Sequence, residues 1–432
     1  MLALLGFATI GLFTVLVMSN RISAVAGLIL IPIIFGLLGG FGAELGNMMV
    51  GGIIQTAPTA VMLVFALLYF MLMYECGLFE PFIKWILSIV GDDPVRIVVG
   101  TALLAIITSL DGDGASAVLI TVTSMYPIYR RLGMNPLIIA LLIGLINPTL
   151  NWLPWGGPAA RAAISLNVEL TDIVTPMLPA MIITIFGALV FAYILGRSER
   201  RRLQAEARLA PGTEDEDVTV QTPRKVIKPK NFWFNLPFTV ALMISLALGI
   251  FPLPALVMAA FAIVITVNFP DVRAQQDKLK PHAGTALMLV TLILAAGAFT
   301  GILNDTGMVE AMAQGMISVV PPSWGPHFGF ITALLSIPLL VILSTDAFFL
   351  GVLPILGETG AAYGVAPEVI ARAGLIGMPC HSLSPMIAPI YFVAALLRTD
   401  IGRLQRFAWP WTLALSLVAL VAAGLTGAIY SA

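Results

Sequence analysis

Apolar stretches of about 17–22 residues follow one another through most of this chain, separated by short segments that carry the charged residues. A helix of that length crosses the roughly 30 Å hydrocarbon core of a bilayer. The composition agrees, because 59% of the residues are hydrophobic and 10% are charged, whereas soluble domains carry about 25% charged residues. The sequence therefore predicts an all-α polytopic membrane protein. It excludes a cytosolic enzyme, a nucleic-acid-binding protein and a disordered scaffold.

The chain divides into two halves with the same plan. In the first half, crossings are expected near residues 2–18, 22–42, 56–74, 135–165 and 173–196, with a pair of shorter apolar segments near 94–110 and 114–129. In the second half, crossings are expected near 233–250, 252–269, 285–303, 367–397 and 407–430, with a shorter pair near 327–343 and 347–358. The stretch between the halves holds nine Lys and Arg residues and six Asp and Glu residues, which is typical of a solvated linker. The predicted units are thus residues 1–196, the linker 197–231 and residues 232–432.

The halves share prolines at a constant offset. Each member of the first set precedes its counterpart by 231 positions: Pro148, Pro154 and Pro158 match Pro379, Pro385 and Pro389. Because proline breaks helices, each half should contain an unwound crossing at the same place, within 147–158 and 379–389. The matched breaks indicate an internal repeat.

The basic residues predict the orientation of the repeats. If each shorter pair is a re-entrant hairpin, each half crosses the membrane five times, and the odd count turns the second half over. Of the 22 Lys and Arg residues, 20 then fall in segments on the cytoplasmic side, as the positive-inside rule requires. We expect two inverted repeats in the cell (inner) membrane, with both termini external and the linker 197–231 cytoplasmic.

Two arginines depart from this rule. Arg161 and Arg372 both lie inside the interrupted crossings, where a cation costs about 2.5–3.5 kcal/mol on insertion scales. One interpretation is that each reaches the external surface or pairs with Glu169, Glu358 or Glu368. The other is an anion clamp, because a guanidinium binds carboxylate in a bidentate fork.

Three aspartates are predicted deep in the membrane, at the hairpin tips. Asp111 and Asp113, each followed by glycine, lie at the first tip, and Asp346 lies at the second. Two adjacent carboxylates repel each other unless one is protonated or a cation lies between them. Mg²⁺ and Ca²⁺ prefer such oxygen ligands. The tips therefore predict a divalent cation site, proton carriage or both, and a capped turn without a ligand is the structural alternative.

The interrupted segments supply further polar groups. Half-helix N-termini and freed backbone N–H groups favour anions. His381 is either a buried core histidine or a cavity residue, and its place in a broken crossing favours the cavity. The residues expected to bind a substrate beside the two arginines are the polar and small groups at the tips and breaks: Ser116, Asn147, Thr149, Asn151, Gly156, Gly157, Ser344, Thr345, His381, Ser382 and Ser384.

At these residues the sequence resembles the citrate–metal:proton symporter family (CitMHS) of the ion transporter superfamily. The resemblance covers nearly the whole chain. Its most specific pieces are Leu110-Asp111-Gly112-Asp113-Gly114, Pro154-Trp155-Gly156-Gly157 with Arg161, Asp346 to Pro354, Ile370-Ala371-Arg372-Ala373 and His381 to Pro385. The chain departs from the family pattern at Thr345, where relatives often carry Asn, and at Ala115, where a hydroxyl residue is common.

The resemblance implies a carrier that takes up citrate complexed with a divalent cation, coupled to protons. It also implies a homodimer with a scaffold domain and a transport domain that moves as an elevator, with no prosthetic group and no enzymatic activity. Arg161 and Arg372 would hold carboxylates, and Asp111, Gly112, Asp113 and Asp346 would hold the cation, Mg²⁺ or Ca²⁺. The three aspartates would also carry the coupling proton.

Two alternative functions share parts of this pattern. A sodium-coupled dicarboxylate, tricarboxylate or arsenite-type permease of the same superfamily would need Na⁺ and ignore divalent cations. An intramembrane aspartyl protease also uses two membrane aspartates, but its chemistry gives no reason for two buried arginines or for matched prolines.

Overall fold

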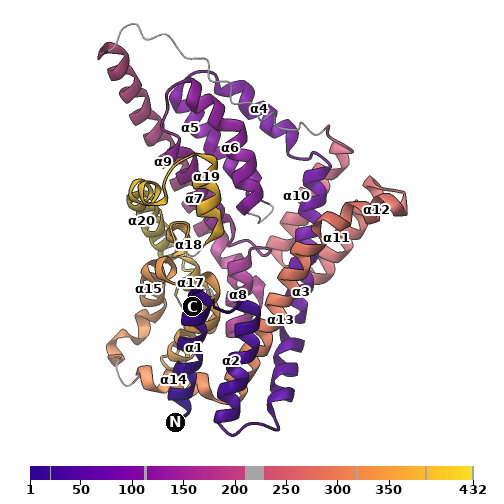
Figure 1. Cartoon of the computed structure of the whole chain (residues 1–432), viewed down its shortest axis with the longest axis vertical. Helices are drawn as coiled ribbons and strands as arrows, with labels where there is room; N and C mark the ends of the chain where they lie inside the picture. The colour runs from indigo at the N-terminus through magenta and orange to yellow at the C-terminus, as the bar shows by residue number, and fades with distance from the viewer. Residues whose placement is uncertain (20, 111–113, 210–227, 318–319, 385–386, 431–432) are drawn as a thin grey trace.

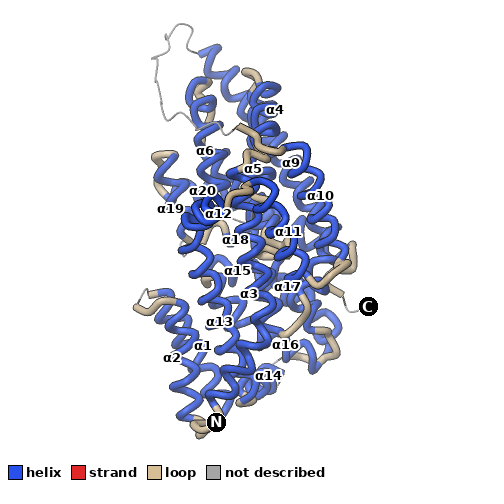
Figure 2. The backbone as a smooth tube through the Cα atoms, turned by 90° about the vertical axis from the view of Figure 1, so that its right-hand side faces the viewer, coloured by secondary structure: helices blue, strands red, loops and turns tan. Residues whose placement is uncertain are grey.

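The computed structural model describes residues 1–19, 21–110, 114–209, 228–317, 320–384 and 387–430. Within these ranges the chain forms helices joined by loops and no strand (Figure 2). In the described chain, five helices are long and apolar enough to cross a membrane by length and composition, and seven shorter helices are also apolar. The predicted class, an all-helical polytopic membrane protein, is confirmed.

The elements follow the predicted segments closely in the first half. They are α1 (Leu2–Met18), α2 (Ala24–Leu38), α3 (Leu45–Glu75), α4 (Glu80–Val90), α5 (Pro94–Thr108), α6 (Gly114–Arg131), α7 (Leu137–Leu150), α8 (Gly157–Leu166) and α9 (Leu170–Leu209). Helix α3 begins eleven residues before the predicted span 56–74. The amphipathic helix α4 was not among the predicted spans because it is too short to cross a bilayer.

The second half contains more short elements. They are α10 (Phe232–Leu248), α11 (Leu253–Asn268), α12 (Val272–Leu279), η1 (Lys280–His282), α13 (Ala283–Asp305), α14 (Met308–Ile317), η2 (Pro322–His327), α15 (Phe328–Ile342), the π-helical turn η3 (Ala347–Val352), α16 (Leu353–Ala362), α17 (Pro367–Leu375), α18 (Met378–His381), α19 (Ala388–Leu396) and α20 (Ile401–Leu425).

Both pairs of shorter segments fold back on themselves. Helices α5 and α6 run antiparallel, since the hydroxyls of Thr101 and Tyr129 lie 3.1 Å apart and those of Thr108 and Thr121 also lie 3.1 Å apart. In the second half the start of α15 meets the end of α16, where the rings of Phe328 and Tyr363 pack at 6.0 Å. Figure 1 shows α5 and α6 side by side at the upper end, whereas α1, α2, α14 and the N-terminus lie at the lower end.

Both proline-containing crossings are interrupted. Helix α7 ends at Leu150 and α8 begins at Gly157, and in the second half α18 ends at His381 and α19 begins at Ala388. Backbone carbonyls at the first hairpin tip and in the second break accept hydrogen bonds from side chains, as membrane depth requires. The indole of Trp155 donates to the Leu110 carbonyl at 2.8 Å, and the amide of Gln405 donates to the Leu383 carbonyl at 2.7 Å.

Left-handed backbone residues recur at the same offset of 231 positions as the prolines. Gly133 and Gly364 have φ of 65° and 79°, and Asn167 and Arg398 have φ of 54° and 51°. Non-glycine residues rarely adopt this conformation. Pro385, the counterpart of Pro154, lies outside the described residues.

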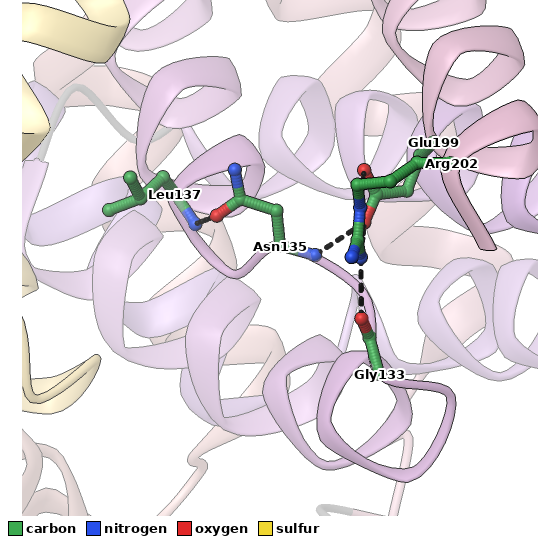
Figure 3. A network of polar contacts seen from close by, with 5 residues as sticks. All are labelled: Gly133, Asn135, Leu137, Glu199 and Arg202. Atoms are coloured by element: carbon green, nitrogen blue, oxygen red, sulfur yellow. Dashed lines mark hydrogen bonds and ion pairs between the residues drawn. The ribbon is translucent and has the colours of Figure 1, made fainter. Parts of the chain in front are cut away.

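Helix α9 continues well beyond the predicted start of the linker at 197 and is helical to Leu209. Its extension is held by polar contacts (Figure 3). The carboxylate of Glu199, which is 6% exposed, accepts from the Asn135 backbone N–H at 2.6 Å and from the Arg202 guanidinium at 2.6 Å. Arg202 also donates to the Gly133 carbonyl at 2.6 Å. These bonds tie α9 to the α6–α7 loop, so Glu199 and Arg202, two charged residues of the predicted linker, have partners within the protein.

The helices pack in two sets. Helices α2, α11 and α13 pack around α3, whereas α5, α7 and α20 pack around α9. The α3–α13 contact is close, because a Cβ on Gly52 would lie 2.0 Å from the Gly297 carbonyl oxygen. Small residues that let backbones approach are typical of helix contacts in membranes.

Candidate functional site

A cavity of about 240 Å³ lies where the interrupted crossings meet the hairpins. This volume is just below the roughly 300–1,000 Å³ that is typical of small-molecule sites. Its polar lining residues come from both halves of the chain: Asn147, Asn151 and Arg161 from the first, and Thr345, His381, Ser382 and Thr412 from the second. The remaining lining is largely apolar. A mostly apolar cavity with a few convergent polar groups is the usual form of a ligand site.

Arg161 is the charged residue among the described lining residues. It lies on α8 and its Nε donates to Oδ1 of Asp346 at 2.6 Å. The two side chains are 19% and 18% exposed. The pair joins the first interrupted crossing to the tip of the second hairpin, 185 residues further along the chain. Arg161 is mostly buried and pairs with Asp346 rather than with Glu169, Glu358 or Glu368. The interpretation of Arg161 as a surface residue or as a partner of these glutamates was therefore wrong.

His381, in the second interrupted crossing, contacts the same hairpin tip. Its ring is 5% exposed, and its Nδ1 lies 2.7 Å from the Leu340 carbonyl oxygen. Since a carbonyl accepts, Nδ1 carries the proton. In the neutral ring Nε2 then accepts from the Thr345 hydroxyl, which lies at 2.7 Å. The ring thus bridges the last turn of α15 and the residue next to Asp346.

The first interrupted crossing presents two amides. The Asn151 side-chain N–H₂ donates to Oδ1 of Asn147 at 3.4 Å. Nδ2 of Asn147 is buried and has no hydrogen-bond partner among the described residues. A buried donor of this kind is costly unless a ligand or water accepts its hydrogen bond. Asn147 therefore contributes an available donor beside the cavity.

Two predicted glycines shape the arginine and its turn. A Cβ on Gly157 would lie 2.6 Å from Nη1 of Arg161, so the missing side chain leaves room for the guanidinium. A Cβ on Gly156 would lie 2.0 Å from the Asn151 carbonyl oxygen, so no larger residue fits at this position of the break.

Several predicted site residues lie elsewhere. Arg372 does not line the cavity, and its Nη1 donates to the Asp172 carbonyl at 3.1 Å. Thr149 is buried and bonds to the Leu145 carbonyl of its own helix at 2.8 Å. The Ser344 hydroxyl accepts from the Ala347 N–H at 3.2 Å and so caps η3. Ser384 is buried in the second break.

The predicted cation ligands at the first hairpin tip, Asp111, Gly112 and Asp113, lie outside the described residues, as does the side chain of Ser116. Elsewhere in the described chain no group of three or more His, Cys, Asp or Glu side chains is placed to hold a metal. The cation site therefore stays a prediction.

Gly144 and Thr412 also line the cavity but were not among the predicted site residues. Helical spacing in the sequence could have identified both residues. Gly144, Asn147 and Asn151 are spaced as one helix face, and so are Leu404, Ala408 and Thr412.

Hairpins that meet interrupted helices around a cavity are the arrangement of membrane transporters, in which irregular backbone at membrane depth lines a binding site. The solved YdaH transporter of Alcanivorax borkumensis has a similar fold, with a TM-score of 0.58 and 15% sequence identity over 89% of this chain and 88% of that one. The fold is thus that of a polytopic helical membrane protein, and a match to a family of transporters makes this protein a transporter and not an enzyme.

The chain belongs to the citrate transporter family, CitMHS, whose profile matches residues 1–377, and the predicted family is confirmed. Two relatives come from Bacillus subtilis (strain 168). One, described as "Citrate transporter", is 45% identical over 99% of this chain and 100% of its own length. The other, described as "Mg(2+)/citrate complex secondary transporter", is 41% identical over 99% of each chain.

Proposed function

We propose that this protein is a secondary transporter that imports citrate as a complex with a divalent cation, coupled to protons. The observation that carries the proposal is Arg161, a partly buried guanidinium that faces a cavity at the junction of both interrupted crossings. Citrate offers three carboxylates to such a group, and guanidinium–carboxylate pairs are among the strongest hydrogen-bonded contacts in proteins. The names of the relatives support citrate as the anion and Mg²⁺ as a cation that can accompany it.

The cavity residues suggest roles in this reaction. Arg161 binds a substrate carboxylate, while Asn147 and Asn151 offer amides to the remaining oxygens. Thr345, His381 and Ser382 line the other side of the cavity. Asp346, with Asp111 and Asp113, supplies negative charge for the cation and for the coupling proton. Arg372 has no contact with the cavity in this conformation, so substrate contact by Arg372 is not part of the proposal.

We further propose two inverted repeats and an elevator mechanism in a homodimer, in which α5 to α9 and α15 to α20 move against α1 to α3 and α10 to α13. The two packing sets support this division, and the recurring left-handed positions support the repeat. The proposed orientation has the α9 extension on the cytoplasmic side of the inner membrane and the N-terminus outside. The distribution of basic residues supports it.

Uptake of labelled citrate into proteoliposomes tests the function. Mg²⁺, Ca²⁺, Ni²⁺, Na⁺ and a pH gradient are varied separately. We expect uptake to require a divalent cation and to rise with an inward proton gradient. Uptake that needs Na⁺ and ignores divalent cations would assign the protein to the sodium-coupled alternative.

Substitution of the two arginines tests the site. Loss of a charge-assisted hydrogen bond costs about 1.5–3 kcal/mol, so Arg161→Ala should lower citrate affinity by roughly 10- to 150-fold. Arg372→Ala is the matched control and should change affinity much less. Equal effects in the two variants, at normal abundance, would refute the assignment of Arg161 as the carboxylate ligand.

A further inference from the structure

The guanidinium that faces the cavity is already paired within the protein. Arg161 is the sole Arg or Lys among the described residues that line the cavity, and its Nε lies 2.6 Å from Oδ1 of Asp346. Asp346 itself is not a lining residue. Arg161 therefore lines the cavity, while the Nε side of its guanidinium binds the carboxylate of Asp346, which lies outside the cavity lining.

This pairing balances the positive charge of Arg161 with the negative charge of Asp346. An isolated cation or anion at membrane depth is costly, and each partner lowers that cost for the other. A substrate carboxylate that uses the Nε edge must take the place of Asp346. Asp346 then keeps its negative charge without its partner, next to an incoming anion.

The hairpin tip holds Asp346 in this position. His381 accepts from the neighbouring Thr345 hydroxyl at 2.7 Å and also contacts the Leu340 carbonyl at 2.7 Å. Ser344 caps the turn that follows. Gly157 leaves room for Nη1 of Arg161. The hairpin tip beside Asp346 is thus held by contacts that do not involve a substrate.

We propose that Asp346 acts as an internal counter-ion that occupies the anion site of the empty carrier and is displaced from Arg161 by the substrate carboxylate. This inference rests on the proposed function in taking the substrate to be an anion. It gives a physical reason for co-transport. A bare anion would leave two carboxylates beside one guanidinium, whereas an anion that brings a cation supplies the positive charge that the displaced Asp346 requires.

The expected magnitude follows from competition. A ligand whose site is open for only a fraction of the time binds more weakly by that fraction. Couplings between sites are typically worth about 5- to 150-fold in affinity. Removal of the internal competitor should therefore strengthen binding of free anion by at least about fivefold, and it should reduce the preference for the cation complex.

The first test measures binding by isothermal titration calorimetry to the purified full-length protein, with free citrate in the presence of EDTA and with citrate plus Mg²⁺. In Asp346→Asn we expect tighter binding of free citrate than in wild type and a smaller ratio between the two affinities. Asp305→Asn, which removes an exposed carboxylate at the end of α13, should match wild type. If Asp346→Asn weakens binding of free citrate, the counter-ion role is overturned.

The second test does not depend on citrate. Asp346→Ala leaves space beside Arg161, and acetate is the probe that could fill it. We expect millimolar acetate to raise the thermal unfolding temperature of Asp346→Ala and to leave wild type and Asp305→Ala unchanged at equal ionic strength. Absence of an acetate effect in Asp346→Ala overturns the inference. Stabilisation by acetate together with no citrate binding in wild type would uphold the counter-ion and refute citrate as the substrate.

Discussion

The contact between His381 and Thr345 joins the second interrupted crossing to the second hairpin, and its strength can be measured. Thr345→Val keeps the shape of the side chain and removes the hydroxyl. It loses one hydrogen bond, about 1 kcal/mol net, and leaves Nε2 of a ring that is 5% exposed without its donor. The expected loss of unfolding free energy is about 1–3 kcal/mol. His381→Phe also removes the donor to the Leu340 carbonyl, so its loss should be larger, about 2–4 kcal/mol.

A double-mutant cycle separates the contact from other effects. If the two side chains interact directly, Thr345→Val should cost little in the His381→Phe background, with a coupling energy of about 0.5–3 kcal/mol. The measurement is unfolding in mixed micelles titrated with SDS, read by tryptophan fluorescence. Citrate affinity should fall in both single variants, because Thr345 and His381 line the cavity.

A second threonine provides the control. The Thr300 hydroxyl is buried and bonds at 3.1 Å to the Ala296 and Gly297 carbonyls of its own helix, so Thr300→Val should leave citrate affinity unchanged and show no coupling to His381→Phe. If the losses of unfolding free energy in Thr345→Val and His381→Phe are fully additive, the hydrogen bond does not hold the hairpin tip in place.

Two further predictions concern the framework. Gly52→Ala would place a Cβ 2.0 Å from the Gly297 carbonyl oxygen, so it should lower the thermal unfolding temperature. Gly51→Ala has no heavy atom within 4 Å of its Cβ and should have no such effect, and equal behaviour of the two variants would contradict the close α3–α13 contact. At the start of α5, burial acts to raise the pKa of Asp93. The hydrogen bond from Arg200, the backbone hydrogen bond from Val95 and the charges of Arg200 and Arg96 together outweigh burial and hold that pKa below its usual value. A lowered pKa stabilises the folded state above the unfolded value of about 3.9, and the contribution is lost as the pH falls through the folded pKa. Asn also caps helices well, so Asp93→Asn keeps the cap and removes the charge. The variant should be less stable than wild type at pH 7 in thermal unfolding scans, and the difference should shrink below about pH 4. A difference in stability that stays constant across this pH range would contradict the ion pair.

The sequence alone determined the class of protein and the approximate positions of most of its apolar helices. The bilayer requires apolar spans of a given length, and proline interrupts a helix wherever it lacks a backbone donor. For that reason α1, α5 and both interrupted crossings match the predicted segments closely. The extra turns of α3 and α9 could not be predicted from apolar length, because contacts with α13 and with the α6–α7 loop hold them.

The site was determined only in part by the sequence. Rare charges at membrane depth identified Arg161 and Asp346 singly, since the cost of burying a charge depends on the residue and its depth. Their pairing, and the departure of Arg372 to the Asp172 carbonyl, depend on how helices far apart in the chain cross. Charge pairing acts over a few ångströms, so residues 185 positions apart become partners only when the tertiary structure brings them together.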